Sequence, residues 1–526
     1  MIRKVFLFLL TAAFVSLLLA DNPLVRHIYT ADPAPLVYND RFYIFTGHDE
    51  GGNGWTLNGW HVLSSADMVH WTDHGEVLGV KDITWLNPHQ AWAAQCIYRN
   101  GKFYFYICDS GEIGVAIADS VLGPYRDALG KPLISNATSG ACPGDDNIDP
   151  TVFVDDDGKA YIYWGTDRVV RQAKLKSNMI EIDGAITVPQ GVNRFFEASW
   201  VHKKGNLYYY SYAAYNSSGE NWPSNIDYAT STNPLGPWTY RGTVNGYAGT
   251  GTNHSGIVEF KGKWYFVYAT DYLSKGVPWE RSVQVNYLYY NEDGTMKKVV
   301  QDTIGVESIG PALFPKDAVY KIRAKHSGKL LDVEGSSISN NANVYQNSDK
   351  SSSSQQWKII EVERGVYQII NRNSGLALDA EASTNNVLQY SYHGRANQRW
   401  KLTGAGNGSY YIVNKDNKRM LEVYYAQTND GANVQHWPFN NETCQMWDLI
   451  RVDSGSVDVG NKLHSFTHAT VKRLIAPSVY IADRYVKMTE ASKIFDITGR
   501  LTELKPEKRS GSGMYIFKAP KMKTPE

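Results

Sequence analysis

Hydrophobic and polar positions alternate with period two along most of the first 315 residues, and turn signals interrupt the alternation at short intervals. The stretch from Asn147 to Gly165, NIDPTVFVDDDGKAYIYWG, has the pattern of a β-hairpin. β-Branched and aromatic residues follow Asp149-Pro150, Asp157-Gly158 supplies a tight turn, and Ala160 to Trp164 forms the returning strand. Long stretches with helical periodicity are few, so the pattern predicts an all-β domain.

This hairpin pattern occurs five times. The copies open at positions that lie 60, 57, 48 and 57 residues apart, namely Asp32, Trp92, Asp149, Glu197 and His254. A repeat of roughly 40 to 60 residues made of short strands is typical of radial repetition, with one blade per copy. We therefore expect a five-bladed β-propeller over residues 21–315, with the five opening residues at equivalent places near the central channel.

Three of the five opening residues are carboxylic acids: Asp32, Asp149 and Glu197. An Asp before Pro, taken alone, is explained as a turn residue. Three acids in register with the repeat are different, because converging carboxylates must leave water against their mutual repulsion. Their register therefore favours a catalytic role over a structural one.

The motifs around these acids resemble those of glycoside hydrolase family 43. They are ADPAP near the start, NIDPTVF in the third copy and FFEASW in the fourth, and the resemblance covers Arg26 to Pro315. The family consists of five-bladed β-propeller enzymes that act on arabinose- and xylose-containing polysaccharides. The resemblance implies that Asp32 is the general base, that Glu197 is the general acid, and that Asp149 tunes the pKa of Glu197 and orients the substrate.

Three further positions belong to the expected site. By the resemblance, Arg281 in WERSVQV contacts substrate and the acidic cluster. Trp92 is expected either to form an apolar wall for the sugar or to be a core residue. His254 matches an axial histidine that ligates calcium in some members of the family. Calcium prefers several oxygen ligands, so we expect a structural or hydrogen-bonding histidine, with calcium as the alternative and no required cofactor.

After Pro315 the pattern changes to three repeats of about 45 residues, each ending in Gln-x-Trp (QQW, QRW, QMW). They resemble the ricin-type β-trefoil, a carbohydrate-binding module, which we expect over residues 316–452. In such folds an Asp and an Asn or Gln hold sugar hydroxyls while an aromatic ring stacks on the sugar. Only the second repeat has the full set, which is Asp379, Tyr390, Asn397 and Gln398.

The other two trefoil repeats depart from this set. The third keeps an aromatic residue, Trp437, but has Glu422 for the Asp and Cys444 for the Asn. The first has Asp332, with Asn347 at the aromatic position. We expect at least one working sugar site, and we expect the tryptophans of Gln-x-Trp to lie in the core.

Both ends of the chain carry signals of their own. Residues 1–20 have two early cations and then an apolar run, which predicts a secretory signal peptide. Residues 453–526, with IFDITGRL and SGSGMYIFK, resemble small β-rich tails that serve in sorting or surface attachment; an accessory β-domain is the alternative. We therefore expect a secreted protein, attached to the cell surface if the tail serves that purpose.

Composition narrows the classes of partner. The chain has 53 Lys and Arg against 53 Asp and Glu, so it offers no electrostatic basis for binding nucleic acid or an anionic membrane. Four cysteines are too few for a disulfide scaffold. A turn at Asn100-Gly101 would place Cys96 opposite Phe105, so no Cys96–Cys108 bridge is predicted.

The sequence thus predicts a secreted, inverting glycoside hydrolase. It would remove α-L-arabinofuranosyl or β-xylosyl units from plant hemicellulose, with plant cell-wall polysaccharide as its partner. An endo-acting arabinanase or a galactan-active hydrolase of the same family is the nearest alternative. A non-catalytic carbohydrate-binding protein is the alternative of another class. The sugar, exo or endo action and the oligomeric state stay open.

Overall fold

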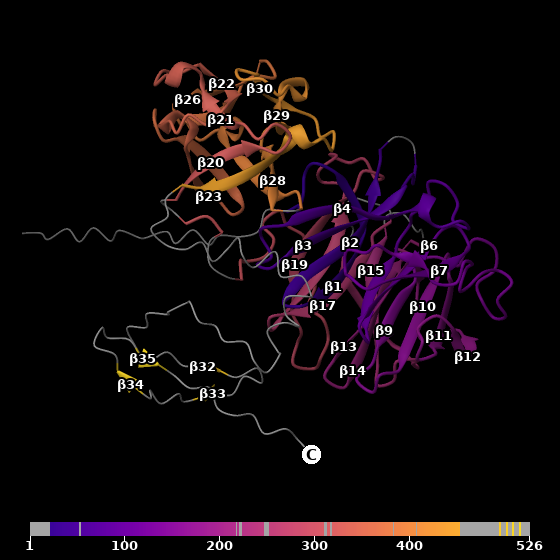
Figure 1. The fold of residues 1–526 in the computed structure, drawn as a ribbon. Coiled ribbons are helices and arrows are strands. Elements are labelled where there is room, and N and C mark those ends of the chain that lie inside the picture. The colour runs from indigo at the N-terminus through magenta and orange to yellow at the C-terminus, as the bar shows by residue number, and fades with distance from the viewer. Residues whose placement is uncertain are drawn as a thin grey trace, which may run out of the picture. The chain divides into compact units, whose positions relative to one another are not determined.

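The structure is a computed structural model. It describes residues 22–51, 54–216, 218–219, 224–246, 252–309, 313–315, 318–381, 383–406 and 408–452, together with four two-residue strands between 494 and 516. The expected signal peptide lies outside the described residues. Every regular element in the described part is a β-strand or a short 3-10 helix, which confirms the all-β prediction (Figure 1).

The first domain is built from consecutive antiparallel strands. Its elements are β1 (Tyr29–Tyr38), β2 (Arg41–Asp49), β3 (Gly59–Ser65), β4 (Thr72–Gly79), η1 (Val80–Asp82), β5 (Gln95–Arg99), β6 (Lys102–Cys108), β7 (Ile113–Ala118), β8 (Arg126–Asp127), β9 (Thr151–Val154), β10 (Ala160–Thr166), β11 (Val169–Leu175), β12 (Ile182–Thr187), β13 (Phe195–Lys204), β14 (Leu207–Ala214), β15 (Asn225–Ser231), β16 (Thr239–Asn245), β17 (Ser255–Phe260), β18 (Lys263–Thr270) and β19 (Ser282–Leu288).

These strands pair as propeller-like blades. The groups β5–β8, β9–β12, β13–β16 and β17–β19 are four separate sheets, and β1–β4 joins a larger sheet through one parallel pair between β4 and β27. The first strands of successive groups contact one another in order, from β1 to β5, β9, β13 and β17, and β17 returns to β1. The strands that carry the predicted acids therefore lie around one centre.

The predicted hairpins and strand registers are present. β9 pairs with β10 across the turn at Asp157-Gly158, as the alternation indicated. Cys96 lies opposite Phe105, and all four cysteines are free and buried. The aromatic return strands supply the core, in which Trp164, Tyr163 and Tyr210 have no exposed surface.

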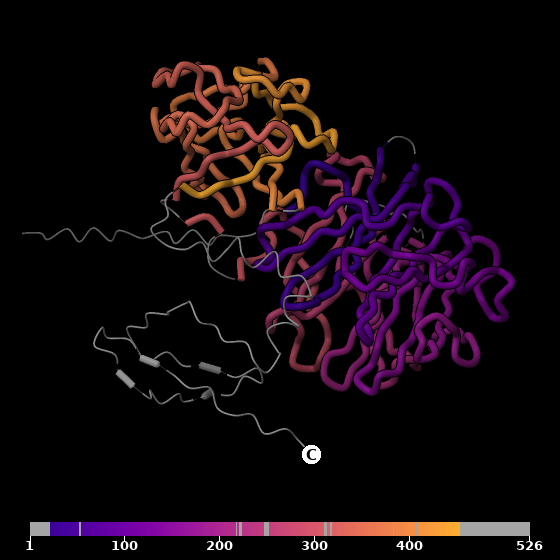
Figure 2. Tube along the Cα trace, viewed as in Figure 1, coloured from indigo at the N-terminus to yellow at the C-terminus, as the bar shows by residue number. Residues whose placement is uncertain are grey.

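The second domain is a β-trefoil (Figure 2). Its elements are β20 (Val319–Ala324), β21 (Leu330–Val333), η2 (Glu334–Ser336), β22 (Ala342–Asn347), η3 (Ser353–Gln355), β23 (Trp357–Glu363), β24 (Val366–Asn371), β25 (Ala377–Ala380), β26 (Val387–Tyr390), η4 (Ala396–Gln398), β27 (Trp400–Gly404), β28 (Ser409–Asn414), β29 (Met420–Val423), η5 (Tyr424–Ala426), β30 (Val434–Trp437), η6 (Thr443–Gln445) and β31 (Met446–Arg451).

The trefoil closes on itself with threefold pseudosymmetry. Strands β20, β23, β24, β27, β28 and β31 pair into a closed barrel, and the hairpins β21–β22, β25–β26 and β29–β30 cover one end. One asparagine from each hairpin closes a ring of amide hydrogen bonds of 2.9 to 3.1 Å, through Asn343, Asn386 and Asn433. Trp357, Trp400 and Trp447 are fully buried, which confirms their predicted core role.

The tail prediction falls mainly on residues outside the described ones. Within 453–526 the structure describes two short ladders, β32 (Ile494–Phe495) with β33 (Leu501–Thr502) and β34 (Lys508–Arg509) with β35 (Tyr515–Ile516). Among the described residues, no helix has the length and apolar character that a membrane span requires.

Closure of the ring depends on a glycine where β17 meets β1. A Cβ built on Gly256 would lie 2.0 Å from Cδ of Pro35. We expect Gly256→Ala to lower the free energy of unfolding by about 1–3 kcal/mol, because backbone must move to relieve the overlap. Gly246→Ala is the matched control, since its Cβ meets open space, and should stay within about 0.5 kcal/mol of wild type. Equal thermal and urea unfolding curves for the two variants would contradict this packing.

Candidate active site

The three predicted acids lie on or next to strands of the central ring. Asp32 is in β1, Asp149 lies two residues before β9, and Glu197 is near the start of β13. The β1–β2 register shifts between Ala31 and Ala34, and the β13–β14 register shifts on both sides of Glu197. Such bulges re-aim side chains out of the regular alternation. The local irregularities therefore point Asp32 and Glu197 differently from their strand neighbours.

Backbone strain accompanies the bulges. Asp32 and Asp149 have φ angles of 48° and 55°, and Ala198, next to Glu197, has φ of 60°. Residues other than glycine adopt this left-handed region at a cost, and such positions cluster at functional sites. Here this conformation occurs at Asp32, at Asp149 and at the residue that follows Glu197.

Arg281 is the cation of the site. Its Nη1 donates to Asp32 Oδ1 at 2.5 Å, and its Nε and Nη2 donate to the two oxygens of Asp49 at 2.9 and 2.8 Å. Arg281, Asp32 and Asp49 have 2%, 7% and 2% of their surface exposed. A buried charge needs a partner and hydrogen bonds. The guanidinium therefore stabilises Asp32 as a carboxylate inside the site.

Glu197 has a different environment. Its Oε2 accepts a hydrogen bond from Thr166 Oγ1 at 3.3 Å. Burial, and next the negative charge of Asp32, raise the pKa of Glu197 to about 8. Burial also raises the pKa of Asp32, but the Arg281 guanidinium opposes that shift. The site thus separates a carboxyl that stays protonated near neutral pH from a carboxylate held by a cation.

Asp149 interacts with both Glu197 and Asp32. Its Oδ2 accepts a 2.9 Å hydrogen bond from the backbone N–H of Ala198, which follows Glu197. Burial first, and then the charges of Glu197 and Asp32, raise the pKa of Asp149 well above its ordinary value. Asp149 therefore lies where its charge state affects that of Glu197.

His254 lies between two of the acids. Its Nδ1 is 4.0 Å from Asp32 Oδ1 and 4.0 Å from Asp149 Oδ2, too far for a hydrogen bond. Burial, and then Arg281, lower the pKa of His254 to about 3, so the imidazole is neutral. In the described part of the chain, no group of three or more His, Cys, Asp or Glu is placed to hold a metal ion.

Trp92 takes an intermediate position. It is partly buried, its Nε1 donates to the Trp55 carbonyl at 3.3 Å, and its own carbonyl accepts from Trp60 Nε1 at 2.7 Å. It packs against two of the propeller cores, which agrees with the core alternative. The Arg281 guanidinium lies 5.2 Å from the ring centroid of Trp55, so Trp55 is the aromatic residue on the cation.

Sequence reasoning missed Asp49, the second carboxylate of the site. It ends β2 and binds Arg281 through both oxygens, and it also accepts the backbone N–H of Arg281 at 2.8 Å. The sequence pattern gave little indication of Asp49, because this residue ends a returning strand. The repeat distinguishes only the residues that open each hairpin. Thr252, which accepts from Arg281 Nη1 at 3.1 Å, and Thr166 had no signal in the pattern.

In the trefoil, the second repeat assembles its predicted set. Asn397 Nδ2 donates to Asp379 Oδ1 at 2.7 Å, and Tyr390, at the end of β26, is partly exposed. Gln398 differs from the prediction of sugar contact. Its amide is fully buried, its Nε2 donates to Asp379 Oδ2 and Ser391 O at 2.8 and 3.0 Å, and its Oε1 accepts from the His393 N–H. Gln398 therefore orients Asp379 from the protein side.

In the first and third trefoil repeats, other residues occupy part of the Asp-aromatic-Asn set. Glu422 in the third repeat is 4% exposed and accepts amide hydrogen bonds from Gln435, Asn440 and Gln445. Trp437 is 41% exposed, so a stacking surface persists there. In the first repeat, Asn347 donates to Asp332 at 3.3 Å in place of presenting a ring.

Two family profiles match the chain. The profile of glycosyl hydrolases family 43 matches residues 20–296, and that of the ricin-type beta-trefoil lectin domain-like family matches residues 313–392, 361–437 and 396–472. The chain is 34% identical over 363 residues to an arabinoxylan arabinofuranohydrolase of Bacillus subtilis, covering 59% of this chain and 70% of the relative. It is 33% identical over 325 residues to a xylosidase/arabinosidase of Bacteroides ovatus, covering 52% of this chain and 95% of the relative.

Among solved structures, the chain is similar to a family 43 arabinoxylan arabinofuranohydrolase from Bacillus subtilis in complex with cellotetraose. The TM-score is 0.51 at 25% identity, covering 83% of this chain and 95% of the other. The similarity thus extends across the propeller-like domain into the part of the chain that holds the trefoil.

The buried ion pairs predict how stability responds to pH. We expect Arg281→Ala to cost about 3–5 kcal/mol at neutral pH, because Asp32 and Asp49 lose their charge partner. Arg281 lowers the pKa of Asp32, so removing it raises that pKa further. The loss should therefore shrink as pH falls and protons neutralise the carboxyl. Arg168→Ala, which removes an exposed cation, is the control for urea unfolding. Equal stability of Arg281→Ala and wild type at pH 7 would contradict the ion-pair account.

Proposed function

Because the chain belongs to glycosyl hydrolase family 43, we propose that it removes α-L-arabinofuranosyl or β-xylosyl units from plant hemicellulose with inversion. Both resemblances inferred from the sequence, to this family and to the ricin-type trefoil, are confirmed. Its relatives, an arabinoxylan arabinofuranohydrolase and a xylosidase/arabinosidase, support the choice of substrate.

The architecture that we propose is a five-bladed propeller over residues 21–315. The closed contacts among β1, β5, β9, β13 and β17 support β1–β4 as one of five blades, although its sheet continues into β27. The trefoil would occupy residues 316–452 and the tail 453–526. We propose that the trefoil holds the enzyme on polysaccharide through the second repeat, where Asp379, Tyr390 and Asn397 come together.

The observation that carries the mechanism is the unequal treatment of the acids. An inverting glycosidase needs a carboxylate base for water and a protonated acid for the leaving oxygen, about 6.5 to 9.5 Å apart. Asp32, paired with Arg281, has the charge state of the base. Glu197, whose pKa is raised to about 8, has the protonation state of the acid. Asp149, hydrogen-bonded to the N–H after Glu197, would orient Glu197, and in its ionised form it would favour a protonated Glu197.

In the reaction, Asp32 takes a proton from water as the oxygen attacks the anomeric carbon. Glu197 gives its proton to the departing glycosidic oxygen. Because the water attacks the face opposite that oxygen, the bond to water forms as the glycosidic bond breaks and the sugar leaves with inverted configuration. Arg281 would contact the substrate as well as Asp32. The proposed steps use only side chains of the chain and water. Calcium at His254 stays a prediction, which loss of activity on chelation and recovery on adding calcium would support.

We also propose that the protein is exported through residues 1–20 and that residues 453–526 attach it to the cell surface. Both proposals rest on the sequence pattern. Export and distribution of a chain ending at Val452, compared with those of the full chain, test the role of the tail. Equal distribution would count against attachment.

The substrate is tested by sugar release from arabinoxylan, xylo-oligosaccharides, linear arabinan and galactan, with products separated by chromatography. We expect free arabinose or xylose from the first two. Oligosaccharides released from arabinan would favour the endo-acting alternative, and galactose the galactan-active one. Binding without release from any of them would favour a non-catalytic carbohydrate-binding protein.

The role of Glu197 predicts both a pH profile and a leaving-group effect. Wild-type activity should fall as pH rises through about 8, because the acid loses its proton there. Glu197→Ala should lose activity on natural substrates about 10²–10⁴-fold, but much less on aryl glycosides whose leaving groups need no protonation. That variant should also lack the fall above pH 8. Asp156→Ala is the control, since this acid lies exposed at a hairpin turn. Equal loss on both substrate types would contradict the acid role.

A further inference from the structure

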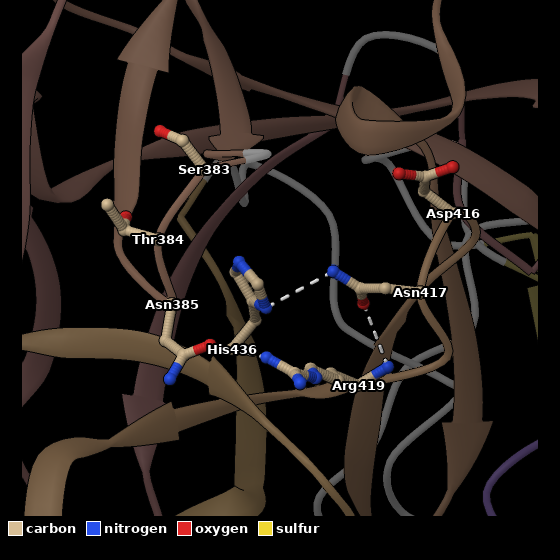
Figure 3. Close-up of a pocket in the computed structure, with 7 residues that line it drawn as sticks. All are labelled: Ser383, Thr384, Asn385, Asp416, Asn417, Arg419 and His436. Carbon is tan, nitrogen blue, oxygen red and sulfur yellow. Dashed lines mark hydrogen bonds between the residues drawn. The ribbon is translucent and has the colours of Figure 1, made fainter.

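The trefoil contains a polar pocket of about 500 Å³ away from its Asp-aromatic-Asn sets. Residues 383–385 from the β25–β26 loop form one side and Asp416, Asn417 and Arg419 before β29 form the other, with His436 of β30 at the base (Figure 3). Cavities of about 300–1,000 Å³ are typical of small-molecule sites. The pocket is therefore large enough for a ligand.

The pocket exists because the third repeat breaks the pseudosymmetry. The residues equivalent to His436 are Gln346 and Gln389, each one position before the end of its strand and fully buried. Gln346 Nε2 donates to the carbonyls of Gln427 and Asn429 at 2.7 and 3.1 Å. Gln389 Nε2 donates to those of Ser337 and Ser339, both at 2.9 Å. In two repeats, a glutamine thus binds the neighbouring loop and fills the space.

Loop length explains why this filling fails at His436. The two ends of the hairpin lie 15 positions apart from Asp332 to Asn347 and from Glu422 to Trp437, but only 11 apart from Asp379 to Tyr390. The shortened loop, in the second repeat, is the one that faces His436. This loop is four residues shorter than its two equivalents, and it lies opposite a His where they lie opposite a Gln. The volume that the loop and the Gln fill in the other two places therefore stays open here.

The pocket's polar groups are already ordered. Asn417 Nδ2 lies 3.2 Å from His436 Nδ1 and Asn417 Oδ1 accepts the Arg419 N–H at 3.0 Å, as Figure 3 shows. The Arg419 guanidinium also donates to the Asn385 side chain. Burial lowers the pKa of His436, so this ring is neutral. Asp416 offsets the charge of Arg419, so the lining carries no net charge.

This chemistry selects the class of ligand. Amide, hydroxyl, guanidinium and carboxylate groups supply both donors and acceptors, which suits a compound with several hydroxyls. Balanced charge disfavours an anion, and the lining contains no Phe, Tyr or Trp ring for stacking. We propose that this pocket is an additional carbohydrate site, which binds a neutral sugar unit through its hydroxyl edge and acts independently of the catalytic centre.

Isothermal titration calorimetry of the full chain with xylotriose, arabinotriose and the free pentoses tests the pocket. The background carries Glu197→Gln to prevent turnover and Tyr390→Ala with Trp437→Ala to remove the stacking surfaces. Ser383→Trp fills the pocket from an exposed position, and Ser339→Trp, an exposed serine in the equivalent loop of the first repeat, is the matched control. Asp416→Ala and Arg419→Ala remove polar groups without filling the space.

We expect one binding event to disappear in Ser383→Trp and to weaken at least tenfold in Asp416→Ala and Arg419→Ala, while Ser339→Trp keeps it. Thermal unfolding verifies that each variant folds, and the two polar-group variants carry the test if Ser383→Trp does not. The proposal is overturned if the background binds none of the sugars at a site that these variants affect. With Glu197 intact, Ser383→Trp should hydrolyse aryl glycosides at the wild-type rate. A negative result for sugar binding in the pocket can therefore be distinguished from a negative result for the proposed enzyme activity.

Discussion

The buried pairing of Arg281 with Asp32 and Asp49 is the interaction on which the rest of the site depends. It brings together β1, β2 and the segment that leads into β19, and it places one positive charge among several acids. Without this cation, a carboxylate could not remain ionised in so buried a place. Because the cation binds Asp32 directly, the proton of the acidic cluster falls to the Glu197 side. The different protonation states of base and acid therefore depend on this arginine at Asp32 and on burial at Glu197.

The propeller supplies what this arrangement needs. Consecutive hairpins bring the first strand of each group to a common centre, so residues about 50 to 60 apart in sequence become neighbours. Bulges at Asp32 and Glu197 then turn individual side chains away from strand alternation. The trefoil uses its repetition differently. Three buried Gln-Trp pairs maintain one framework, and variation in the hairpins decides which repeat can bind a ligand.

Much of the fold and part of the site could be predicted from the sequence, for physical reasons. Alternation and Asp-Gly or Asn-Gly turns specify hairpins and their register locally, as Cys96 opposite Phe105 shows. From the repeat spacing it could also be predicted that Asp32, Asp149 and Glu197 lie near one centre. Asp49 could not be found in this way, since it ends a strand and acts only through a residue 232 positions away. Gln398 was misjudged because residue type does not reveal that all sides of its amide are engaged inside the protein.

The most direct test of the central claim is to follow the configuration of the released sugar by proton NMR during the first minutes of hydrolysis. If Asp32 activates water while Glu197 protonates the leaving oxygen, the first product has the anomeric configuration opposite to that of the substrate, and mutarotation then mixes the two. A first product with the substrate's own configuration would mean a covalent glycosyl-enzyme and a carboxylate nucleophile, and would contradict the assignment of Asp32 as a base.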